Sequence, residues 1–512
     1  MNGLDTYIAQ FVYVSQDTKI KKTEETGRHL LHLLTINPGP SEANARKQFK
    51  TPNDFDLYKV PEKFRKLVVL HIQLMRAIYV NKSFVEAFDT LNEMCLCLVR
   101  ACEQQDKWIM PAVVGIFSEF VMVYKAKNKR DPEDLDSFMV EDNEFGMESG
   151  DSSRKKKKLN LETLIDTLRR GFNVVFNDKN TDINLSKKHY VFFFLGNLVK
   201  YCFKMGKLDF AKSIMKTVES SRQNLPNMSQ NVATKKYAIM YLYYTALIAL
   251  DDGDYVTSEA RLDEAMSLVN DYNVNTKSSK QVQSLLLILI PLKIYNHGKL
   301  PKGTIYNNNH NNSNNNLTNT ENSTEFDNQN KTQKNKNNKK KSNESTTNIA
   351  QNKGKKDESI WQRFPYLAFL YRDNFFPAMK QGSLLKYENV IEANQLVLLR
   401  RHIYILMQLL TQFVQVQVIK KTYAICQEIE KSHIISLSAF QLGLTISKYY
   451  SDKNQGEFRL DILVDKMPTL EVETILATLI SQGRINAYIS NGKQCVVFSK
   501  TNPFPTFGEK KR

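Results

Sequence analysis

The stretch from Leu437 to Pro505 constrains the fold more than any other part of the chain. Its local pattern predicts three helices, at 437–450, 459–467 and 470–482, followed by two short strands. In the third of these helices the apolar residues recur at the i, i+3, i+4, i+7, i+8 spacing of a helix that packs on one side. These residues are Val472, Ile475, Leu476, Leu479 and Ile480. Three helices followed by a two-stranded wing make a winged helix.

The residues at the ends of the third helix support this interpretation. We expect the Thr469 hydroxyl to cap the helix, and Glu471 and Glu473 to interact favourably with its positive first turn. Gly483 suits the left-handed residue that ends a helix. Alternating apolar and polar residues follow, and Asn491-Gly492 is a strong signal for the turn of a hairpin.

Upstream, one unit recurs: an apolar helix, a tight polar turn and a second helix with alanine on its inner face. The turns fall at Gly206, Gly253 and Gly382, with a weaker copy near Asn81. Because such a hairpin cannot bury its own apolar face, neighbouring hairpins must stack. The sequence therefore predicts an all-α protein, a tetratricopeptide-like helical-repeat solenoid that ends in the winged helix. The alternative is a generic helical domain with chance similarities.

Composition divides the chain further. An acidic run (131–151) passes directly into a basic one (Arg154 to Lys158), and residues 307–352 are rich in Asn; such segments bury too little apolar area to fold. We expect these segments: an N-terminal segment 1–58, N-terminal helical hairpins 59–126, a disordered acidic and basic insert 127–158, the solenoid 159–298, a disordered Asn- and Lys-rich insert 299–358, the last helical repeats 359–436, the winged helix 437–505 and a basic tail 506–512.

The sequence contains no pattern that indicates an enzyme. Phosphate-binding glycine motifs, a nucleophile elbow and a zinc-protease motif are all missing. His29 and His32 are three residues apart, which without a third ligand is more often structural than metal-binding. The six cysteines lie in apolar stretches and are typical of buried, reduced thiols. We expect no cofactor, no metal and no small-molecule substrate.

Charge and targeting signals indicate the kind of partner. The net charge of +17 favours acidic partners, nucleic acid among them. No apolar run is expected to be long enough to cross a bilayer, and the N-terminus does not resemble a signal peptide, so we expect no membrane insertion. The basic runs at 154–158, 339–341 and 353–356 resemble nuclear import signals.

The C-terminal sequence also resembles a known family. Residues 483–490 read GRINAYIS and residues 499–505 read SKTNPFP. Together with the helical repeats upstream, they resemble the PCI domain, in the branch of PCI-domain-containing protein 2, or signalosome subunit 12-like proteins. The resemblance covers most of 159–505, and both inserts and the N-terminus depart from it.

This resemblance implies a non-catalytic subunit of a nuclear complex that couples transcription to messenger RNA export at the nuclear pore. It implies two protein partners, a larger scaffold with its own PCI-type fold and a small, acidic, mostly disordered protein. A pure protein–protein scaffold of the proteasome-lid or signalosome kind is the alternative.

Two sets of basic residues are the candidate binding sites. A sequence-specific transcription factor is disfavoured, because helix 470–482 carries two glutamates and no basic residue to read bases. Cations flanking that helix favour contact with the nucleic-acid backbone: Lys448, Lys453, Arg459, Lys466, Arg484, Lys493 and Lys500. Lysines around the Gly206 turn have the spacing that aligns side chains on a helix face, and they are candidates for docking the acidic partner: Lys200, Lys204, Lys207, Lys212 and Lys216.

Overall fold

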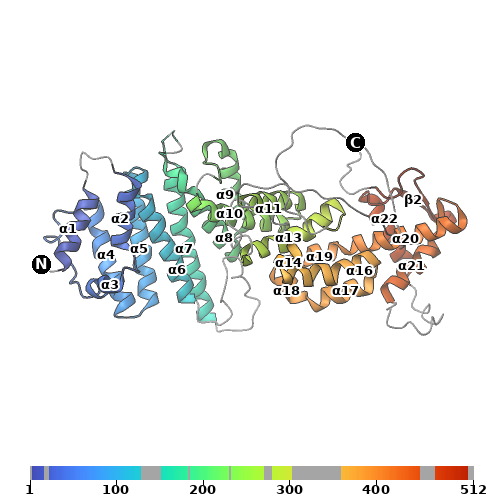
Figure 1. Ribbon diagram of the computed structural model, residues 1–512, viewed down its shortest axis with the longest axis horizontal. Helices are drawn as coiled ribbons and strands as arrows, with labels where there is room; N and C mark the ends of the chain where they lie inside the picture. The colour runs from blue at the N-terminus through green and yellow to red at the C-terminus, as the bar shows by residue number, and fades with distance from the viewer. Residues whose placement is uncertain are drawn as a thin grey trace, which may run out of the picture.

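The computed structural model describes residues 3–16, 22–128, 151–180, 182, 185–229, 232–269, 279–301, 359–449 and 467–505. Helices stand side by side along an elongated molecule, with the N-terminal helices at one end and the winged helix at the other (Figure 1). Buried apolar residues from nearly every element join into one continuous core. The predicted all-α solenoid with a terminal winged helix is confirmed.

The first part of the stack contains α1 (Gly3–Ser15), α2 (Glu24–Leu34), α3 (Pro40–Arg46), α4 (Glu62–Tyr79), α5 (Phe84–Glu103), the 3-10 turn η1 (Lys107–Ile109), α6 (Met110–Asn128) and α7 (Asp151–Phe176). The sequence pattern predicts one helix in the N-terminal segment, Thr23 to Leu34, and α2 confirms it; α1 and α3 were not predicted. Pro40, interpreted as part of a loop, starts α3, where its missing N–H costs nothing. Tyr7 and Phe11 of α1 are buried against the solenoid, so the N-terminal segment belongs to the core.

The predicted insert 127–158 needs correction at both ends. Helix α6 extends to Asn128, and α7 begins at Asp151, so residues 151–158 continue into the helix that follows. The acidic residues of 129–150 lie outside the described part of the chain.

The middle of the stack contains η2 (Lys187–Tyr190), α8 (Val191–Met205), α9 (Leu208–Ser220), η3 (Arg222–Asn224), α10 (Val232–Asp251), α11 (Tyr255–Val269) and α13 (Lys280–His297). The predicted hairpin turns are present here. Gly206 and Gly253 adopt left-handed φ values of 74° and 76°, and each separates two helices of a pair. A side chain at either position would strain the turn.

The last repeats contain α14 (Ile360–Arg363), α15 (Pro365–Leu367), the π-helix η4 (Ala368–Phe375), α16 (Phe376–Gln381), α17 (Leu384–Ala393), α18 (Gln395–Arg400), α19 (Tyr404–Leu409) and α20 (Thr411–Glu430). The sequence predicted one helix over 395–413, but His402 adopts a left-handed φ of 57° and separates α18 from α19. The sequence also placed the start of the next helix at Val418, whereas α20 begins at Thr411.

The winged helix contains β1 (Ile434–Ser436), α21 (Leu437–Tyr449), α22 (Thr469–Ser481), β2 (Ala487–Ser490), the turn η7 (Asn491–Lys493) and β3 (Cys495–Phe498). The three strands form an antiparallel sheet in the order β1-β3-β2, with Ile435 and Ile489 both opposite Val496. The sequence missed β1, so the predicted start of the domain at Leu437 is too late. Because β1 follows α20 and pairs with β3, α20 is the first helix of the winged helix.

Details of the predicted winged helix also change. Residues 459–466 of its expected second helix lie outside the described residues. Helix α22 is preceded by Pro468 and has no side-chain cap, so the predicted Thr469 cap is wrong. Gly483 is left-handed as predicted, whereas in the strand connection the left-handed residue is Gln494 rather than Gly492.

Helix α22 packs on the core as its apolar spacing requires. Val472, Leu476 and Leu479 are fully buried. Ile475 and Ile480 are partly exposed and pack against the edge of the same cluster.

Residues 107–127 form the one candidate membrane span found among the described residues. They are long and apolar enough by composition to cross a membrane, so the expectation that no run reaches this length is wrong. In the structure the segment packs against α2 and α5, and Ile116, Phe117 and Phe120 are buried in the core. A buried helix of a helical stack has the same composition, so the segment gives little support to a membrane location.

Candidate nucleic-acid and partner interface

The cations expected around the wing differ in how exposed they are. Lys493 in η7 and Lys500 after β3 are both exposed, at opposite ends of β3. Among the described residues neither forms an ion pair. Lys453, Arg459 and Lys466 lie outside the described residues.

Lys448 at the end of α21 already has an acidic partner. Its Nζ lies 3.1 Å from Oε1 of Glu471 on α22, so this ion pair joins the two helices. Partial burial by itself lowers the pKa of Lys448, but the hydrogen bond and charge of Glu471 outweigh that effect and raise it. A phosphate would have to compete with Glu471 for this ammonium group.

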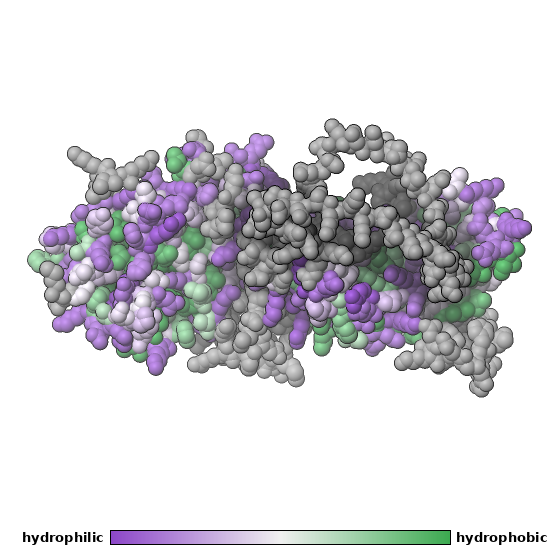
Figure 2. All heavy atoms as spheres, viewed as in Figure 1, coloured by the Kyte–Doolittle hydropathy of each residue, from purple (hydrophilic) through white to green (hydrophobic). Residues whose placement is uncertain are grey.

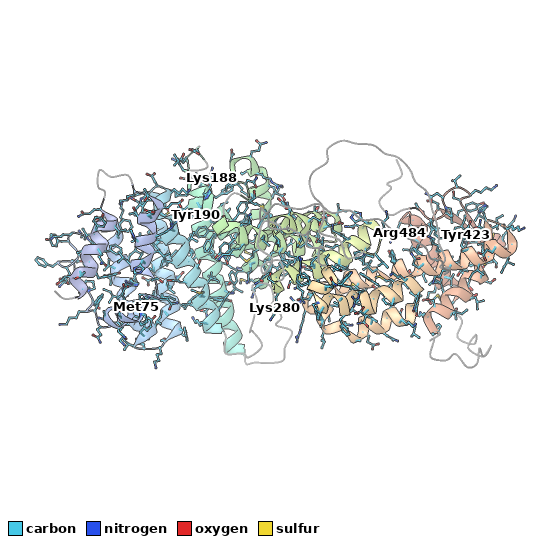
Figure 3. The ribbon with its side chains drawn as sticks, in the orientation of Figure 1. Met75, Lys188, Tyr190, Lys280, Tyr423 and Arg484 are labelled. Atoms are coloured by element: carbon cyan, nitrogen blue, oxygen red, sulfur yellow. The ribbon has the colours of Figure 1, made fainter. Side chains whose placement is uncertain are left out.

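Arg484 connects the winged helix to the solenoid. Its two terminal nitrogens donate to the carbonyl oxygen of Tyr295, at 3.3 and 3.4 Å, and its guanidinium lies 5.2 Å from the centre of the Tyr295 ring. Burial lowers the pKa of Arg484. Tyr295 is near the end of α13, and Figure 3 shows Arg484 where the winged helix meets this part of the stack. The sequence interpretation of Arg484 as a phosphate contact is therefore corrected to a structural role.

The lysines around the Gly206 turn do not form one free surface. Lys200 is only 2% exposed and its Nζ lies 5.6 Å from the centre of the Tyr201 ring. Lys207 pairs with Glu162 of α7 at 3.5 Å, and Lys212 pairs with Asp252 after α10 at 2.7 Å. Lys204 is half-buried and Lys216 is exposed. The lysines are therefore divided between buried, ion-paired and exposed positions, and the expected common face does not form.

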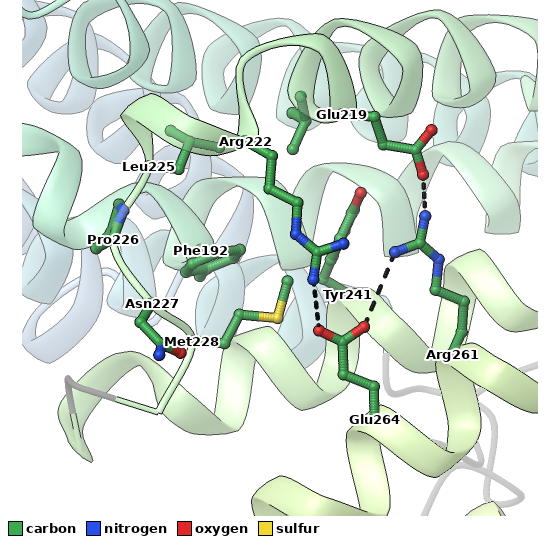
Figure 4. Close-up of a pocket in the computed structure, with 11 residues that line it drawn as sticks. Phe192, Glu219, Arg222, Leu225, Pro226, Asn227, Met228, Tyr241, Arg261 and Glu264 are labelled. Carbon is green, nitrogen blue, oxygen red and sulfur yellow. Dashed lines mark hydrogen bonds and ion pairs between the residues drawn. The ribbon is translucent and has the colours of Figure 1, made fainter.

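At the opposite end of the α8–α9 hairpin from this turn lies a pocket of about 330 Å³, between the hairpins α8–α9 and α10–α11 (Figure 4). Arg261 pairs with Glu219 and lies 3.9 Å from Glu264, which in turn pairs with Arg222 at 2.9 Å. Much of the remaining pocket wall is apolar and includes Phe192. Since each guanidinium already has a glutamate, the ion pairs tie the hairpins together and leave the pocket nearly neutral.

Comparison with known proteins establishes the family. The PCI domain sequence model matches residues 391–500. A protein CSN12 homolog of Debaryomyces hansenii is 36% identical over 478 residues, covering 92% of this chain and 93% of the relative. This chain belongs to the PCI-domain family of CSN12 homologs and PCI domain-containing protein 2. The zebrafish (Danio rerio) PCI domain-containing protein 2 is 21% identical over 91% of this chain and 90% of its own length. The Cop9 signalosome complex subunit 12 of Saccharomyces cerevisiae is 19% identical over 69% and 71%.

The PCI match begins within α17, upstream of the sheet, and so includes the whole of α20. This agrees with a winged helix whose first helix is α20. PCI-domain proteins of this kind are generally scaffold subunits of complexes, and this chain is one of them.

The winged helix of the PCI domain exposes large apolar side chains that the sequence analysis did not single out. We call them the winged-helix apolar surface: Ile425 and Ile429 of α20, Ile434 of β1, and Leu442, Ile446 and Tyr449 of α21. Ile429 is 76% exposed. Figure 2 shows hydrophobic side chains at the surface of this end of the molecule. The i, i+4 pairs 425/429 and 442/446 were the available sequence signal.

The contact between α20 and α21 places these residues together. A Cβ atom on Gly443 would collide with Oγ1 of Thr422, so the two helices approach closely at this point. Ile425 and Ile429 follow Thr422 by three and seven residues, and therefore lie on the side of α20 next to the contact. Leu442 precedes Gly443 directly. The apolar residues thus flank one helix–helix seam beside the edge strand β1.

Proposed function

We propose that this protein is a non-catalytic subunit of a nuclear complex that couples transcription to messenger RNA export. In this proposal its winged-helix apolar surface docks on a larger scaffold protein with its own PCI-type fold. The exposed surface on α20, β1 and α21 is the observation that carries the proposal. Contiguous exposed apolar residues on a soluble domain are typical of protein–protein interfaces, because water disfavours leaving them uncovered.

The double substitution Ile425→Asp and Ile429→Asp tests this docking surface. Both residues are exposed, so the new charges remain solvated in the free protein. We therefore expect the free energy of unfolding to change by less than about 1 kcal/mol. In affinity purification of the tagged full chain, the amount of PCI-domain partner recovered should then fall at least tenfold, because binding would bury two charges at the interface. Val256→Asp on α11, which is 72% exposed, is the matched control. Undiminished recovery of the partner by the double variant would exclude this surface.

The second candidate is a pure protein–protein scaffold of the signalosome or proteasome-lid type, which the name of the Saccharomyces cerevisiae relative favours. The same affinity purification distinguishes the export complex from the signalosome or lid alternative. Export factors recovered from the nuclear fraction support the proposal, whereas signalosome or lid subunits support the alternative. A chain found only in the cytoplasmic fraction would contradict a nuclear location, which the basic runs at 154–158, 339–341 and 353–356 favour.

A small, acidic, disordered protein is the other proposed partner. Its docking at the Gly206 turn now depends chiefly on the exposed Lys216, since Lys207 and Lys212 already have carboxylate partners. We expect Lys216→Glu to weaken that association in the same purification.

Sequence-independent binding of the RNA or DNA backbone is the remaining part of the proposal. It depends on Lys493 and Lys500, the exposed wing cations. Changing both to Glu should weaken binding of all single-stranded oligonucleotides alike. The slope of log affinity against log salt should fall by about 1.4, or 0.7 for each lost contact. Lys50→Glu with Lys179→Glu, at exposed sites in the first part of the stack, controls for the change in net charge. An unchanged slope in the wing variant would exclude the wing.

A further inference from the structure

The ends of three helices meet around Lys127, the second-last residue of α6. Its Nζ atom lies 4.4 Å from the centre of the Phe88 ring on α5 and donates to Oδ1 of Asn160 on α7 at 3.1 Å. Burial lowers the pKa of Lys127, and the charge of Asp89 on α5 opposes this shift. The end of α6 therefore lies between the early turns of α5 and α7, and all three helices are in contact (Figure 1).

Large apolar side chains are exposed around this meeting point. Phe84 and Val85 of α5 are 51% and 55% exposed, and Leu159 of α7 is 62% exposed. Val80, directly after α4, is 57% exposed. We call these four residues the α6-end surface. Apolar side chains that are exposed together are typical of a binding surface, because water disfavours leaving them uncovered.

Contacts between α5 and α7 place these side chains at one level of the stack. Because the end of α6 meets the early turns of both helices, α5 and α7 run parallel. The Thr167 hydroxyl of α7 donates to Oδ1 of Asn92 on α5 at 2.5 Å. Phe84 and Leu159 each lie eight residues before one of these two partners, and are therefore level with each other. Val80 precedes Phe84 by four residues, across the tight turn between α4 and α5.

The region around the α6-end surface is positively charged. The basic run from Arg154 to Lys158 is in the first turns of α7, and Lys82 is exposed in the turn between α4 and α5. The acidic residues of the same helix ends are Glu86 and Asp89 of α5 and Asp151 of α7, so the basic residues outnumber them. An acidic segment that also carries apolar side chains would complement this surface in both respects.

The chain itself supplies a segment of this composition. Residues 129–150, which lie outside the described part of the chain, connect the end of α6 to the start of α7, so both of their ends are tethered at this region. Eight of the residues 131–149 are acidic. The same stretch contains large apolar residues: Leu135, Phe138, Met139, Val140, Phe145 and Met147. Tethering gives such a segment an effective concentration of about millimolar, an advantage that a separate acidic protein lacks.

We propose that the segment 131–149 binds the α6-end surface of its own chain. Its apolar side chains cover Val80, Phe84, Val85 and Leu159, and its carboxylates offset the charge of the basic run at 154–158. The bound segment therefore competes with any other acidic ligand for that run. This contact lies within one chain and is independent of the proposed export function.

A synthetic peptide tests the contact. The full chain is compared with a linker chain, in which a glycine- and serine-rich linker of equal length replaces residues 131–149. A fluorescent peptide of residues 131–149 should bind the linker chain, and should bind the parent at least tenfold more weakly, because the parent's own segment occupies the surface. Failure of the peptide to bind the linker chain would overturn the inference. Equal binding to both chains would also overturn it, and would leave the surface to a separate acidic protein.

Substitutions at the surface test its location. Val85→Asp with Leu159→Asp in the linker chain should weaken peptide binding at least tenfold, because the new carboxylates repel an acidic segment. The matched control is Val256→Asp with Leu185→Asp, at sites that are 72% and 54% exposed elsewhere in the stack. All four residues are exposed, and thermal unfolding checks that each variant keeps its fold. Equal weakening by the two pairs would show that the peptide responds to net charge alone, and the proposed location would be wrong.

Proteolysis measures the same contact in the full chain. A glutamate-specific protease should cleave within 131–149 at least tenfold faster in the Val85→Asp, Leu159→Asp variant than in the parent, since the segment is no longer held on the surface. The Val256→Asp, Leu185→Asp control should be cleaved at the parental rate. Equal cleavage of the parent and the surface variant would contradict binding of the segment at this place.

Discussion

Replacing Leu479 by Asp is expected to unfold the winged helix. Leu479 is fully buried on α22, and its own carbonyl oxygen accepts from the N–H groups of Arg484 and Ile485, at 2.8 and 3.3 Å, where the chain turns towards β2. A carboxylate at this position would have no partner in the core. Burying an unpaired charge and losing the leucine contacts together cost more than about 4 kcal/mol.

Hydrogen exchange of the full chain measures this effect locally, since a two-part protein need not unfold in one step. Amides of 467–505 should lose protection in the Leu479→Asp variant, while amides of the first part of the stack keep theirs. Ala477→Asp introduces the same charge at an exposed position of α22 and is the control. Parent-like protection of 467–505 in Leu479→Asp would contradict the placement of Leu479 in the core.

The second large effect concerns Glu119, which is buried on α6. Its carboxylate accepts hydrogen bonds from the Thr35 hydroxyl and, at 3.2 Å, from the N–H of Ile36. Burial raises the pKa of Glu119 to about 7 in spite of these two hydrogen bonds. The raised pKa lies above the ordinary value of 4.5, so the folded state binds a proton more tightly than the unfolded chain. The stability from this group is complete below pH 4.5 and is lost as the pH rises to 7.

Titratable groups near Glu119 also affect how the stability of the protein depends on pH. Burial, and then the charge of Arg46, lower the pKa of His71 to about 3, and His71 contacts the Tyr7 hydroxyl at 2.9 Å and the Thr35 carbonyl at 3.3 Å. A lowered histidine pKa has the opposite linkage, since its stability is lost on acidification below pH 6.5. The two effects largely cancel between pH 4.5 and 6.5, so the comparison with a variant is more informative than the parent profile. The charge of Glu119 also contributes, after burial, to the raised pKa of the Cys95 thiol.

The expected result is a difference between Glu119→Gln and the parent. As the pH is lowered from 7.5 to 4.5, the free energy of unfolding of the variant should fall relative to the parent by about 3 kcal/mol, because the pKa of Glu119 is about 7 in the folded state and 4.5 in the unfolded chain. Denaturant unfolding across this range measures the difference. Glu103→Gln, at an exposed position of α5, controls for the loss of one negative charge. A constant difference at all pH values would show that Glu119 titrates normally.

Local patterns were sufficient to predict much of this fold. The spacing of Val472, Leu476 and Leu479 determines which side of α22 is buried, because 3.6 residues per turn leave one face for the core. Gly206, Gly253 and Gly382 mark the hairpin turns, because only glycine adopts left-handed φ without strain. The C-terminal motif was enough to identify the family.

Other features depend on residues distant in the sequence. Strand β1 has only three residues, too few for an alternating pattern, and pairing with β3 about sixty residues later makes it a strand. Helices α1 and α3 are weak in isolation; burial of Tyr7 and Phe11 stabilises α1, and burial of Ala43 and Arg46 stabilises α3.

The candidate site shows the same division. The sequence by itself determined which residues are cations and that the chain ends in a winged helix. Only the tertiary structure decided which cations are available, because Arg484 binds Tyr295 and Lys212 binds Asp252, partners that no local spacing reveals. Charge is a property of the residue, whereas its availability is set by the carbonyls and carboxylates that folding brings within hydrogen-bond distance.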